Sequence, residues 1–469
     1  MNQPPQPKKP DDKTAIQPLL EWVEANKKQA NDKTARLFSA GFGAFLGLSL
    51  LKFGNPCIFE NLVDRPADSL QWLLSAWPAQ VGYELLAGFV IAGLFLFRIG
   101  NRPRTALLFL PLLWLAWQFV AARHSVDAAL TVATLKHFSA CVACFFIGFL
   151  VLPRVRPGFF LAGLLAGLAV VIVTGWQQRF GGLEETRRYF YAYLYPQMHT
   201  VPAELLQKVS SNRIFSTLFY PNALAGVLLL LLPVSLALVW GQAGWLTTGA
   251  RKLLAGLLAL GALACLYWSQ SKGGWLLMLL LGLIALRRAP WPQRTKVMLV
   301  AAILAMGLAG FTLRFAGYFE KGATSAVARG DYWRAAVQTS LAHPLYGTGP
   351  GTFAIAYKQI KKPGAEMARL VHNDYLQQAS DSGLIGGAAY LGFITASLWF
   401  GWRRLAPQGD WLRFSAWLGL LGWCLQSLLE FGLYIPALAW PGLALMGWLL
   451  GSANGIDNAP AARYTATRS

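Results

Sequence analysis

Charged residues are scarce in this chain, and acidic residues are the scarcest of them. Among 469 residues there are 21 Asp and Glu against 41 Lys and Arg, and charged residues make up only 13% of the sequence. A soluble protein of this length carries about a quarter charged residues. Hydrophobic residues make up 55% and form long runs. This composition excludes an ordinary soluble globular protein and predicts a chain that crosses a membrane many times.

Cysteine is also rare, with five residues in the whole chain. Four of the five lie in apolar runs, and the i,i+3 pair Cys141 and Cys144 has no ligand-rich partner segment. We interpret all of them as small packing residues, which excludes a disulfide framework and a cysteine metal site. The five are Cys57, Cys141, Cys144, Cys265 and Cys424.

The polar N-terminus lacks the apolar core of a cleaved signal peptide, so we expect the first apolar run, near Leu37, to act as a signal anchor. The formal net charge of +20 is spread between apolar runs and is not gathered on one soluble face. Nucleic acid is therefore not expected as a partner.

About twelve apolar runs are long enough to cross a bilayer core. They cover residues 36–52, 82–98, 105–122, 128–152, 158–178, 214–240, 253–268, 274–287, 297–313, 382–402, 412–430 and 437–452. The predicted fold is an all-α polytopic membrane protein, with membrane lipid as its surroundings.

The short loops on one side of these spans are rich in Arg and Lys, and the N-terminus falls on the same side. By the positive-inside rule this side is cytoplasmic, and both termini lie there. The residues are Arg98, Arg102, Arg104, Arg154, Arg156, Arg251, Lys252, Arg287, Arg288, Arg294, Lys296, Arg403, Arg404 and Arg413.

The opposite side receives three longer pieces, about 53–81, 179–213 and 314–381, and the last two are basic. Basic outer loops break the usual bias. They are either solvated loop charge or a binding surface for an anionic ligand at the outer leaflet. Tyrosines gathered between Tyr189 and Tyr195 suit a membrane interface or a sugar-binding surface.

The most informative stretch runs from Leu370 to Gln377 and contains His372, Asn373 and Tyr375. A histidine among fixed cations suits chemistry on a substrate that bears phosphate. At helical spacing His372 shares a face with Tyr375. Glu430 and Tyr434, near the outer end of another span, are candidates to orient it.

Several cations accompany this histidine. Arg213 stands where the chain enters a span at outer headgroup depth, and Lys272 lies in a very short outer connection. A kink is expected near Pro221 and Asn222, with its freed backbone groups facing protein or water. Further cations in the two basic outer loops are Arg187, Arg188, Arg329 and Arg334.

The Gly/Pro-rich segment from His343 to Gly351 predicts a tight, irregular turn. It is not a Walker loop, because no G-K-[ST] follows, but a backbone nest for phosphate is possible. Metal is not expected, since the outer loops contain no HxxxH or DxD-type pair and guanidinium groups can neutralise a pyrophosphate themselves.

A transporter is an alternative, which predicts ionisable residues at mid-membrane. Lys136 and His137, inside the fourth span, are the pair that fits it, although Lys136 can also bind phosphate from within the membrane. Most of the other polar residues gather at the outer face, which favours an enzyme.

Taken together, the motifs of residues 210–450 resemble the O-antigen ligase/polymerase superfamily of bacterial inner-membrane glycan transferases. The similarity lies in their order and spacing. The motifs are Arg213 to Gly226, Ser-x-Ser-Lys-Gly-Gly-Trp around Lys272, Arg329-x-x-x-Trp333, Pro344-Leu345-x-Gly347-x-Gly349-x-Gly351-x-Phe353, and His372-Asn373-x-Tyr375-Leu376 followed by Gly383-x-x-Gly386. The family usually has Arg at the position of Lys272 and often Glu at that of Asp381, so the charge is kept at both.

The resemblance implies a GT-C-like glycosyltransferase with a large helical periplasmic loop, using no nucleotide sugar, cofactor or metal. Its donor would be a glycan on undecaprenyl pyrophosphate, with His372 as general base and Arg213 and Arg329 holding the leaving group. Lys272, Arg187, Arg188, Arg334, Asn373, Tyr375, Lys136, Asn222 and Glu430 would bind substrate.

The resemblance leaves the acceptor open between three activities. An O-antigen ligase, which uses a lipid A-core acceptor, is preferred, and the compact outer region without an added periplasmic domain favours it over a protein glycosyltransferase. A polymerase or a protein O-oligosaccharyltransferase are the alternatives. The predicted organisation is a cytoplasmic segment (1–35), N-terminal spans (36–178), a periplasmic loop (179–213), central spans (214–313), the main periplasmic catalytic loop (314–381), C-terminal spans (382–452) and a cytoplasmic tail (453–469).

Overall fold

The computed structural model describes residues 33–97, 106–197, 206, 209–242, 246–320, 324–405 and 410–452. These described residues form helices and turns without a β-strand. Most of the predicted N-terminal segment and all of the predicted C-terminal tail lie outside them, as do Arg98, Arg102 and Arg104.

The helices follow one another closely along the chain. In order they are Lys33–Lys52, η1 (Cys57–Leu62), α2 (Ser69–Leu74), α3 (Ala79–Leu96), α4 (Phe109–Ala122), α5 (Ala128–Leu150), α6 (Gly158–Gln177), α7 (Leu183–Tyr189), α9 (Pro221–Gln242), α10 (Thr248–Ser269), α11 (Lys272–Arg288), α12 (Gln293–Glu320), α13 (Thr324–Ala342), α14 (Phe353–Ile360), α15 (Asp374–Arg403), α16 (Trp411–Gln426), η7 (Gly432–Tyr434) and α17 (Pro436–Ser452).

Among the described residues, eight helices are long and apolar enough to cross a membrane. Each predicted span coincides with a helix, and the shorter helices α4, α11, α16 and α17 occupy the remaining predicted positions. The prediction of an all-α polytopic membrane protein is confirmed.

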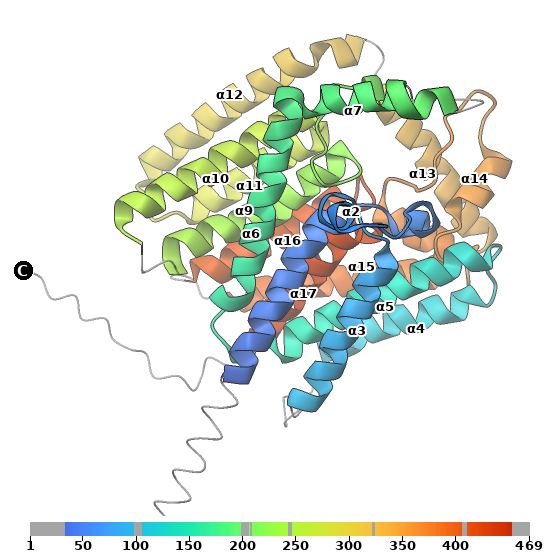
Figure 1. Ribbon diagram of the computed structural model, residues 1–469, viewed down its shortest axis with the longest axis horizontal. Coiled ribbons are helices and arrows are strands. Elements are labelled where there is room, and N and C mark those ends of the chain that lie inside the picture. The colour runs from blue at the N-terminus through green and yellow to red at the C-terminus, as the bar shows by residue number, and fades with distance from the viewer. Residues whose placement is uncertain are drawn as a thin grey trace, which may run out of the picture.

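The outward-facing surface of α12 shows why the chain needs lipid around it. The most apolar window of this helix has a mean hydropathy of 2.0, and 0% of it is buried. Leu313, Met298 and Met306 are 83%, 71% and 69% exposed. The helix runs along the edge of the bundle (Figure 1). In water such a surface would aggregate, whereas hydrocarbon solvates it.

Closely packed helices form the centre, where α17 lies along α5. Small residues let the two backbones approach, which is how helices associate in lipid. A Cβ on Gly447 of α17 would lie 2.0 Å from the carbonyl oxygen of Phe145 on α5. On Gly148 of α5 it would lie 2.2 Å from the carbonyl oxygen of Ala444. Any larger residue at these positions would force the helices apart.

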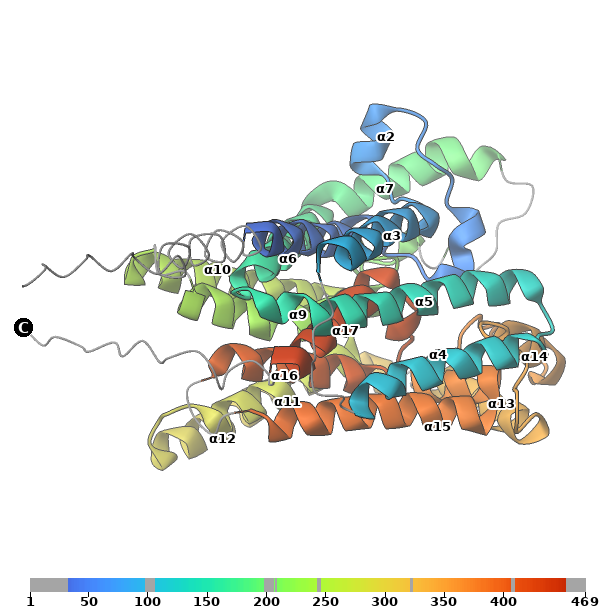
Figure 2. The same ribbon diagram turned by 90° about the horizontal axis from the view of Figure 1, so that it is seen from below.

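The elements that connect the predicted spans lie toward one end of the bundle. Figures 1 and 2 both show α13 and α14 at the right-hand end and the turn between α11 and α12 at the opposite end, and Figure 2 shows α2 and α7 in the right half. These four helices belong to the ranges 53–81, 179–213 and 314–381. The fold therefore brings three segments that are distant in sequence toward one end of the molecule.

Two helix starts differ from the predicted spans. α9 begins at Pro221 and not at 214, so the predicted kink there is wrong, since Pro fits the first position of a helix. Residues 213–220 are irregular, and the side-chain oxygen of Gln178 accepts from the backbone N–H groups of Phe215 and Ser216 at 3.0 and 2.7 Å.

The second difference concerns α15, which begins at Asp374 and not near 382. It continues past Gly383, whose φ of +73° interrupts the helical backbone. The hydrophobic pattern located only the part beyond this interruption, because the first turns are polar and buried in protein.

Candidate active site

Glu430 lies at the centre of the polar cluster, in the loop between α16 and η7, with its side chain 12% exposed. One carboxylate oxygen, Oε2, lies 3.1 Å from Nδ1 of His372. The other, Oε1, accepts hydrogen bonds from Nη2 of Arg329 and, at 2.5 Å, from Nδ2 of Asn222. A single carboxylate thus connects side chains from α9, α13 and the segment before α15.

Arg213 joins this cluster through Asn222. Its Nη2 donates to Oδ1 of Asn222 at 3.0 Å, and its Nε donates to the carbonyl oxygen of Ser269 at 2.9 Å. The structure therefore brings together His372, Arg213 and Arg329, which are 43 to 159 residues apart in sequence. Of the two residues predicted to orient His372, Glu430 contacts it.

The contact with Glu430 fixes which ring nitrogen of His372 carries a proton. Burial alone would raise the pKa of Glu430, but the charges of Arg329, His372 and Arg213 outweigh burial and hold this pKa below its ordinary value. A carboxylate only accepts hydrogen bonds, so Nδ1 of His372 carries the proton in this contact. In neutral His372 the lone pair then lies on Nε2, the nitrogen that a general base uses.

His372 itself is not on a helix. Its φ is +55°, a left-handed conformation that is uncommon outside glycine, and it directly precedes Asn373, the N-cap of α15. The prediction that it shares a helical face with Tyr375 is therefore wrong. The ring packs edge-on against Phe431 at 4.7 Å between centroids and stacks on Tyr332 at 5.9 Å. Strained backbone of this kind persists where its surroundings hold it, often at functional sites.

Two further cations complete the cluster. Burial, with the charges of Arg213, Arg329 and Arg314, lowers the pKa of Lys272 to about 8. The ammonium of Lys272 lies 5.2 Å from the ring centroid of Phe315, and the guanidinium of Arg314 lies 5.5 Å from that of Tyr267.

Arg314 was missed as a candidate because the sequence places it at the start of a loop. In the structure α12 extends through it to Glu320, so Arg314 lies near the C-terminal end of this helix. Its position one residue beyond the predicted span is the signal that was available. Arg213, Arg329, Lys272 and Arg314 together carry more positive charge than the carboxylate of Glu430 neutralises. This excess of positive charge suits an anion with several charges.

Three other predicted cations, Arg187, Arg188 and Arg334, differ in their partners and exposure. Arg187 on α7 donates to the backbone oxygens of Val209, Ser210 and Ser211 at 3.0, 3.3 and 3.0 Å, so it holds the segment that leads to Arg213. Arg188 is 79% exposed and lies 3.9 Å from Glu184. Arg334 is exposed on α13.

Asn373, Tyr375 and Tyr434 form structural contacts. Asn373 accepts from the N–H groups of Tyr375 and Leu376, at 3.0 and 3.1 Å, and so caps α15. The hydroxyl of Tyr375 donates to the carbonyl oxygen of Cys424 at 3.0 Å. The hydroxyl of Tyr434 donates to Asp381 at 3.1 Å, so Tyr434 binds α15 and does not orient His372.

Lys136 and His137, the pair that fits a transporter, lie in different surroundings. Lys136 is exposed, and its charge acts on the carboxyl of Glu60 in η1. His137 is fully buried, with Nε2 at 2.7 Å from the carbonyl oxygen of Leu433. The two side chains thus do not line one common path. All five cysteines are buried thiols, which confirms their interpretation as packing residues.

The Gly/Pro turn is bound to α15. The N–H groups of Thr348 and Gly349 donate to the backbone oxygens of Ser380 and Asp381, at 3.2 and 2.8 Å. The N–H group of Gly351 donates to the side-chain carboxylate of Asp381 at 2.8 Å. The break at Gly383 leaves the α15 carbonyls available to accept these bonds. The N–H groups of Gly347, Thr348, Gly349 and Gly351 are therefore occupied, which argues against a phosphate nest formed by them.

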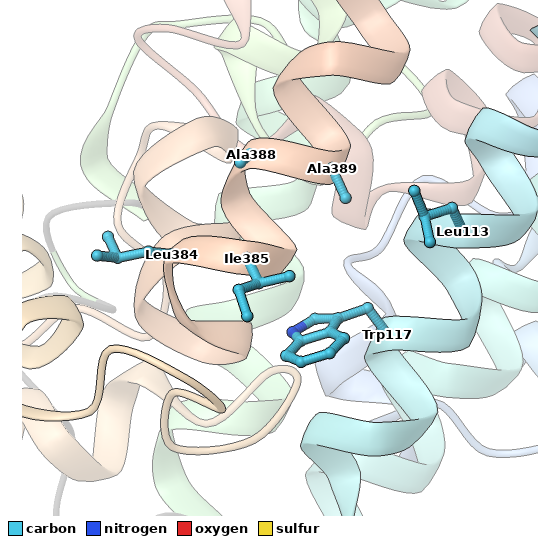
Figure 3. A pocket seen from close by; sticks show the side chains of 6 residues that line it. All are labelled: Leu113, Trp117, Leu384, Ile385, Ala388 and Ala389. Carbon is cyan, nitrogen blue, oxygen red and sulfur yellow. The ribbon is translucent and has the colours of Figure 1, made fainter.

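An apolar groove of about 430 Å³ lies between α4 and α15. Leu113 and Trp117 of α4 face Ile385 and Ala389 of α15 across it (Figure 3). The groove does not include the Glu430 cluster, and its walls suit a hydrocarbon chain rather than a phosphate.

No curated protein matches the chain. Residues 256–391 match a family described as O-antigen ligase. The matched region is less than a third of the chain, and it contains Lys272, Arg314, Arg329 and His372. Arg213 and Glu430 lie outside it. The match extends from α10 to α15 of this multi-pass membrane protein and agrees with the resemblance to the O-antigen ligase/polymerase superfamily that the motifs indicated.

Proposed function

We propose that this protein is an O-antigen ligase. It transfers a glycan from undecaprenyl pyrophosphate to a hydroxyl of a lipid A-core oligosaccharide, at the periplasmic face of the bacterial inner membrane. The observation that carries the proposal is the convergence of His372, Arg213 and Arg329 on Glu430.

His372 acts as the general base. Nδ1 faces Glu430, so Nε2 accepts the proton of the acceptor hydroxyl while the hydroxyl oxygen attacks the anomeric carbon of the donor sugar. The carboxylate then stabilises the imidazolium that forms, as in other histidine–carboxylate pairs. General bases contribute about 10²–10⁴-fold to such rates.

The cations act on the leaving group. As the bond between the anomeric carbon and the phosphate oxygen breaks, its electron pair leaves with the undecaprenyl pyrophosphate. Arg213 and Arg329, with Lys272 and Arg314, bind this developing charge. Fixed cations in a partly buried site act strongly on such charge because they need no reorganisation. A single displacement inverts the anomeric centre.

The rest of the donor extends from this point in two directions. The apolar groove between α4 and α15 offers a place for the polyprenyl tail, since its residues Leu384 to Ala389 lie on the helix that begins next to His372. Arg188 and Arg334, both exposed, are candidates for contacts with the glycan. We assign Arg187 and Asn222 to positioning Arg213, and Asn373 and Tyr375 to positioning α15.

The test is reconstitution of the purified protein with undecaprenyl-pyrophosphate glycan, with and without lipid A-core. We expect a glycan-bearing lipid A-core product only when that acceptor is present. Growth of the glycan on its own lipid carrier without lipid A-core would show a polymerase and contradict the ligase assignment. Transfer to a protein acceptor alone would contradict it as well.

A further inference from the structure

Two fully buried titratable side chains contact the turn that follows Glu430, and the chemistry proposed above does not use them. Asp374 is the first residue of α15, and His137 lies in the middle of α5. Both are 0% exposed. Polar groups so deeply buried destabilise a fold unless they have partners, so their partners indicate what they are for.

Both side chains bind the backbone of the same residue, Leu433, one at its N–H and the other at its carbonyl oxygen. The N–H of Leu433 donates to Oδ2 of Asp374 at 2.9 Å. The carbonyl oxygen of Leu433 lies 2.7 Å from Nε2 of His137. A carbonyl only accepts, so Nε2 of His137 carries the proton and donates it. The backbone of Leu433 is thus held at its N–H by α15 and at its carbonyl oxygen by α5.

The Asp374–Leu433 bond, the His372–Glu430 contact and the short chain segments between them form a closed ring of contacts. This ring includes the proposed base. Asp374 is two residues after His372, and Leu433 is three residues after Glu430. The Asp374–Leu433 bond therefore ties together the two segments whose side chains meet in the His372–Glu430 contact. A second tie strengthens the ring, since the N–H of Asp374 donates to the carbonyl oxygen of Ser427 at 2.8 Å.

His137 connects this ring of contacts to α5, which lies at the centre of the molecule. α5 packs along α17 through glycine contacts, so it is a firm support for the turn of η7. The left-handed backbone of His372, with φ of +55°, needs such a support, because strained residues persist only where their surroundings hold them.

We propose that Asp374 and His137 are positioning residues, which fix the backbone of Leu433 and thereby hold Glu430 against His372. The inference rests on the proposed function, since it assumes that this pair takes part in transfer. A reacting group displaced by about 1 Å can lose about 10²-fold in rate, so loss of either tie slows the chemical step while the distant lipid-binding surfaces stay in place.

The test compares truncating with conservative variants in the reconstituted full-length protein. Asp374→Ala and His137→Leu remove the bonds to Leu433. Asp374→Asn keeps an oxygen that accepts from the Leu433 N–H, and His137→Gln keeps an N–H that donates to its carbonyl. Ser397→Ala on α15 and Cys144→Ala on α5 are matched controls, because both residues are buried on the same helices away from the ring.

We expect Asp374→Ala and His137→Leu to lower kcat about 10- to 100-fold, with the KM for both substrates nearly unchanged. Asp374→Asn and His137→Gln should restore most of the loss, and the two controls should behave as wild type. Gly432→Ala is a further probe, since its Cβ would lie 2.7 Å from Nε1 of Trp423 and would shift the same turn. If a truncating variant does not fold, Gly432→Ala tests the positioning role in its place. We expect its kcat to fall with KM unchanged.

Unchanged kcat in the folded truncating variants, or in Gly432→Ala if those do not fold, would overturn the inference. Equal losses in the conservative variants would overturn it too, as would a fall in kcat that the controls share. His372→Ala, measured alongside, separates the two proposals. If it abolishes transfer while the ring variants do not, only the positioning role fails. If it leaves transfer intact, the proposed function fails.

Discussion

At the scale of single residues, the carboxylate of Glu430 determines how the cluster is charged and oriented. It binds Arg329 and His372 directly and reaches Arg213 through Asn222. Without it, the cations would repel one another and the histidine would lose the partner of its Nδ1. With it, Arg213, Lys272 and Arg314 still leave an excess of positive charge for a pyrophosphate.

Lys272 gives the cluster a pH dependence. Burial and the charges of Arg213, Arg329 and Arg314 lower its pKa to about 8, so in the folded protein its charge is lost as pH rises through about 8. We expect the KM for the donor to rise about tenfold between pH 7 and pH 9, because a charged hydrogen bond to phosphate is lost. Steady-state transfer rates at a series of donor concentrations measure this.

Lys272→Arg should remove that rise, since arginine stays charged throughout this range. Lys252→Arg, near the start of α10, is the matched control and should keep the wild-type profile. The same pKa has a consequence for stability. Between about pH 8 and 10.5 the unfolded chain binds more protons at Lys272 than the folded one, so its contribution to stability rises with pH there. A flat KM profile in the wild type would contradict this role of Lys272.

The sequence indicated His372, Arg213 and Arg329 through the order of their motifs, and it offered Glu430 as a partner. It did not show that Asn222 links Arg213 to Glu430, or that Arg187 is occupied by the backbone before Arg213. These contacts join residues from separate helices. A local pattern contains no information about them, because they exist only once the helices have packed.

At the scale of elements, apolar patterning located the helices well but missed polar or irregular helix starts. α15 begins eight residues before its apolar part, because its first turns are buried against protein and not lipid. The Gly/Pro turn was recognised as irregular, yet its partner was not. Gly383 opens the backbone of α15 to accept the turn's N–H groups, and that pairing depends on tertiary contact.

The packing of α5 against α17 predicts which glycines tolerate a side chain. Gly447→Leu should lower the melting temperature and the yield of folded protein in detergent, because even its Cβ would lie 2.0 Å from the carbonyl oxygen of Phe145. Gly256→Leu on α10, where a Cβ meets nothing within 4 Å, is the control and should be neutral. A Gly447→Leu protein that melts like wild type would show that the two helices are not held by this close approach.

At the scale of the whole molecule, α13 and α14 lie at the opposite end of the bundle from the turn between α11 and α12 (Figure 2). The charge pattern predicts that the end bearing α13 and α14 faces the periplasm and that the turn between α11 and α12 faces the cytoplasm. Both ends carry exposed residues suited to labelling, Lys358 on α14 and Arg294 on α12.

Cysteine labelling tests this orientation with little background, because all five native cysteines are buried. A membrane-impermeant maleimide should label Lys358→Cys in intact spheroplasts, and Arg294→Cys only after lysis. The opposite pattern would invert the topology and place the His372 cluster on the cytoplasmic side.

The central claim is that one imidazole, held by Glu430 beside two guanidinium groups, removes the proton from the acceptor sugar. The most direct measurement is the single-turnover rate of glycan transfer by His372→Ala, with donor binding measured on the same preparation. The account predicts a rate about 10²–10⁴-fold below wild type with donor binding intact. A wild-type rate in this variant would contradict it.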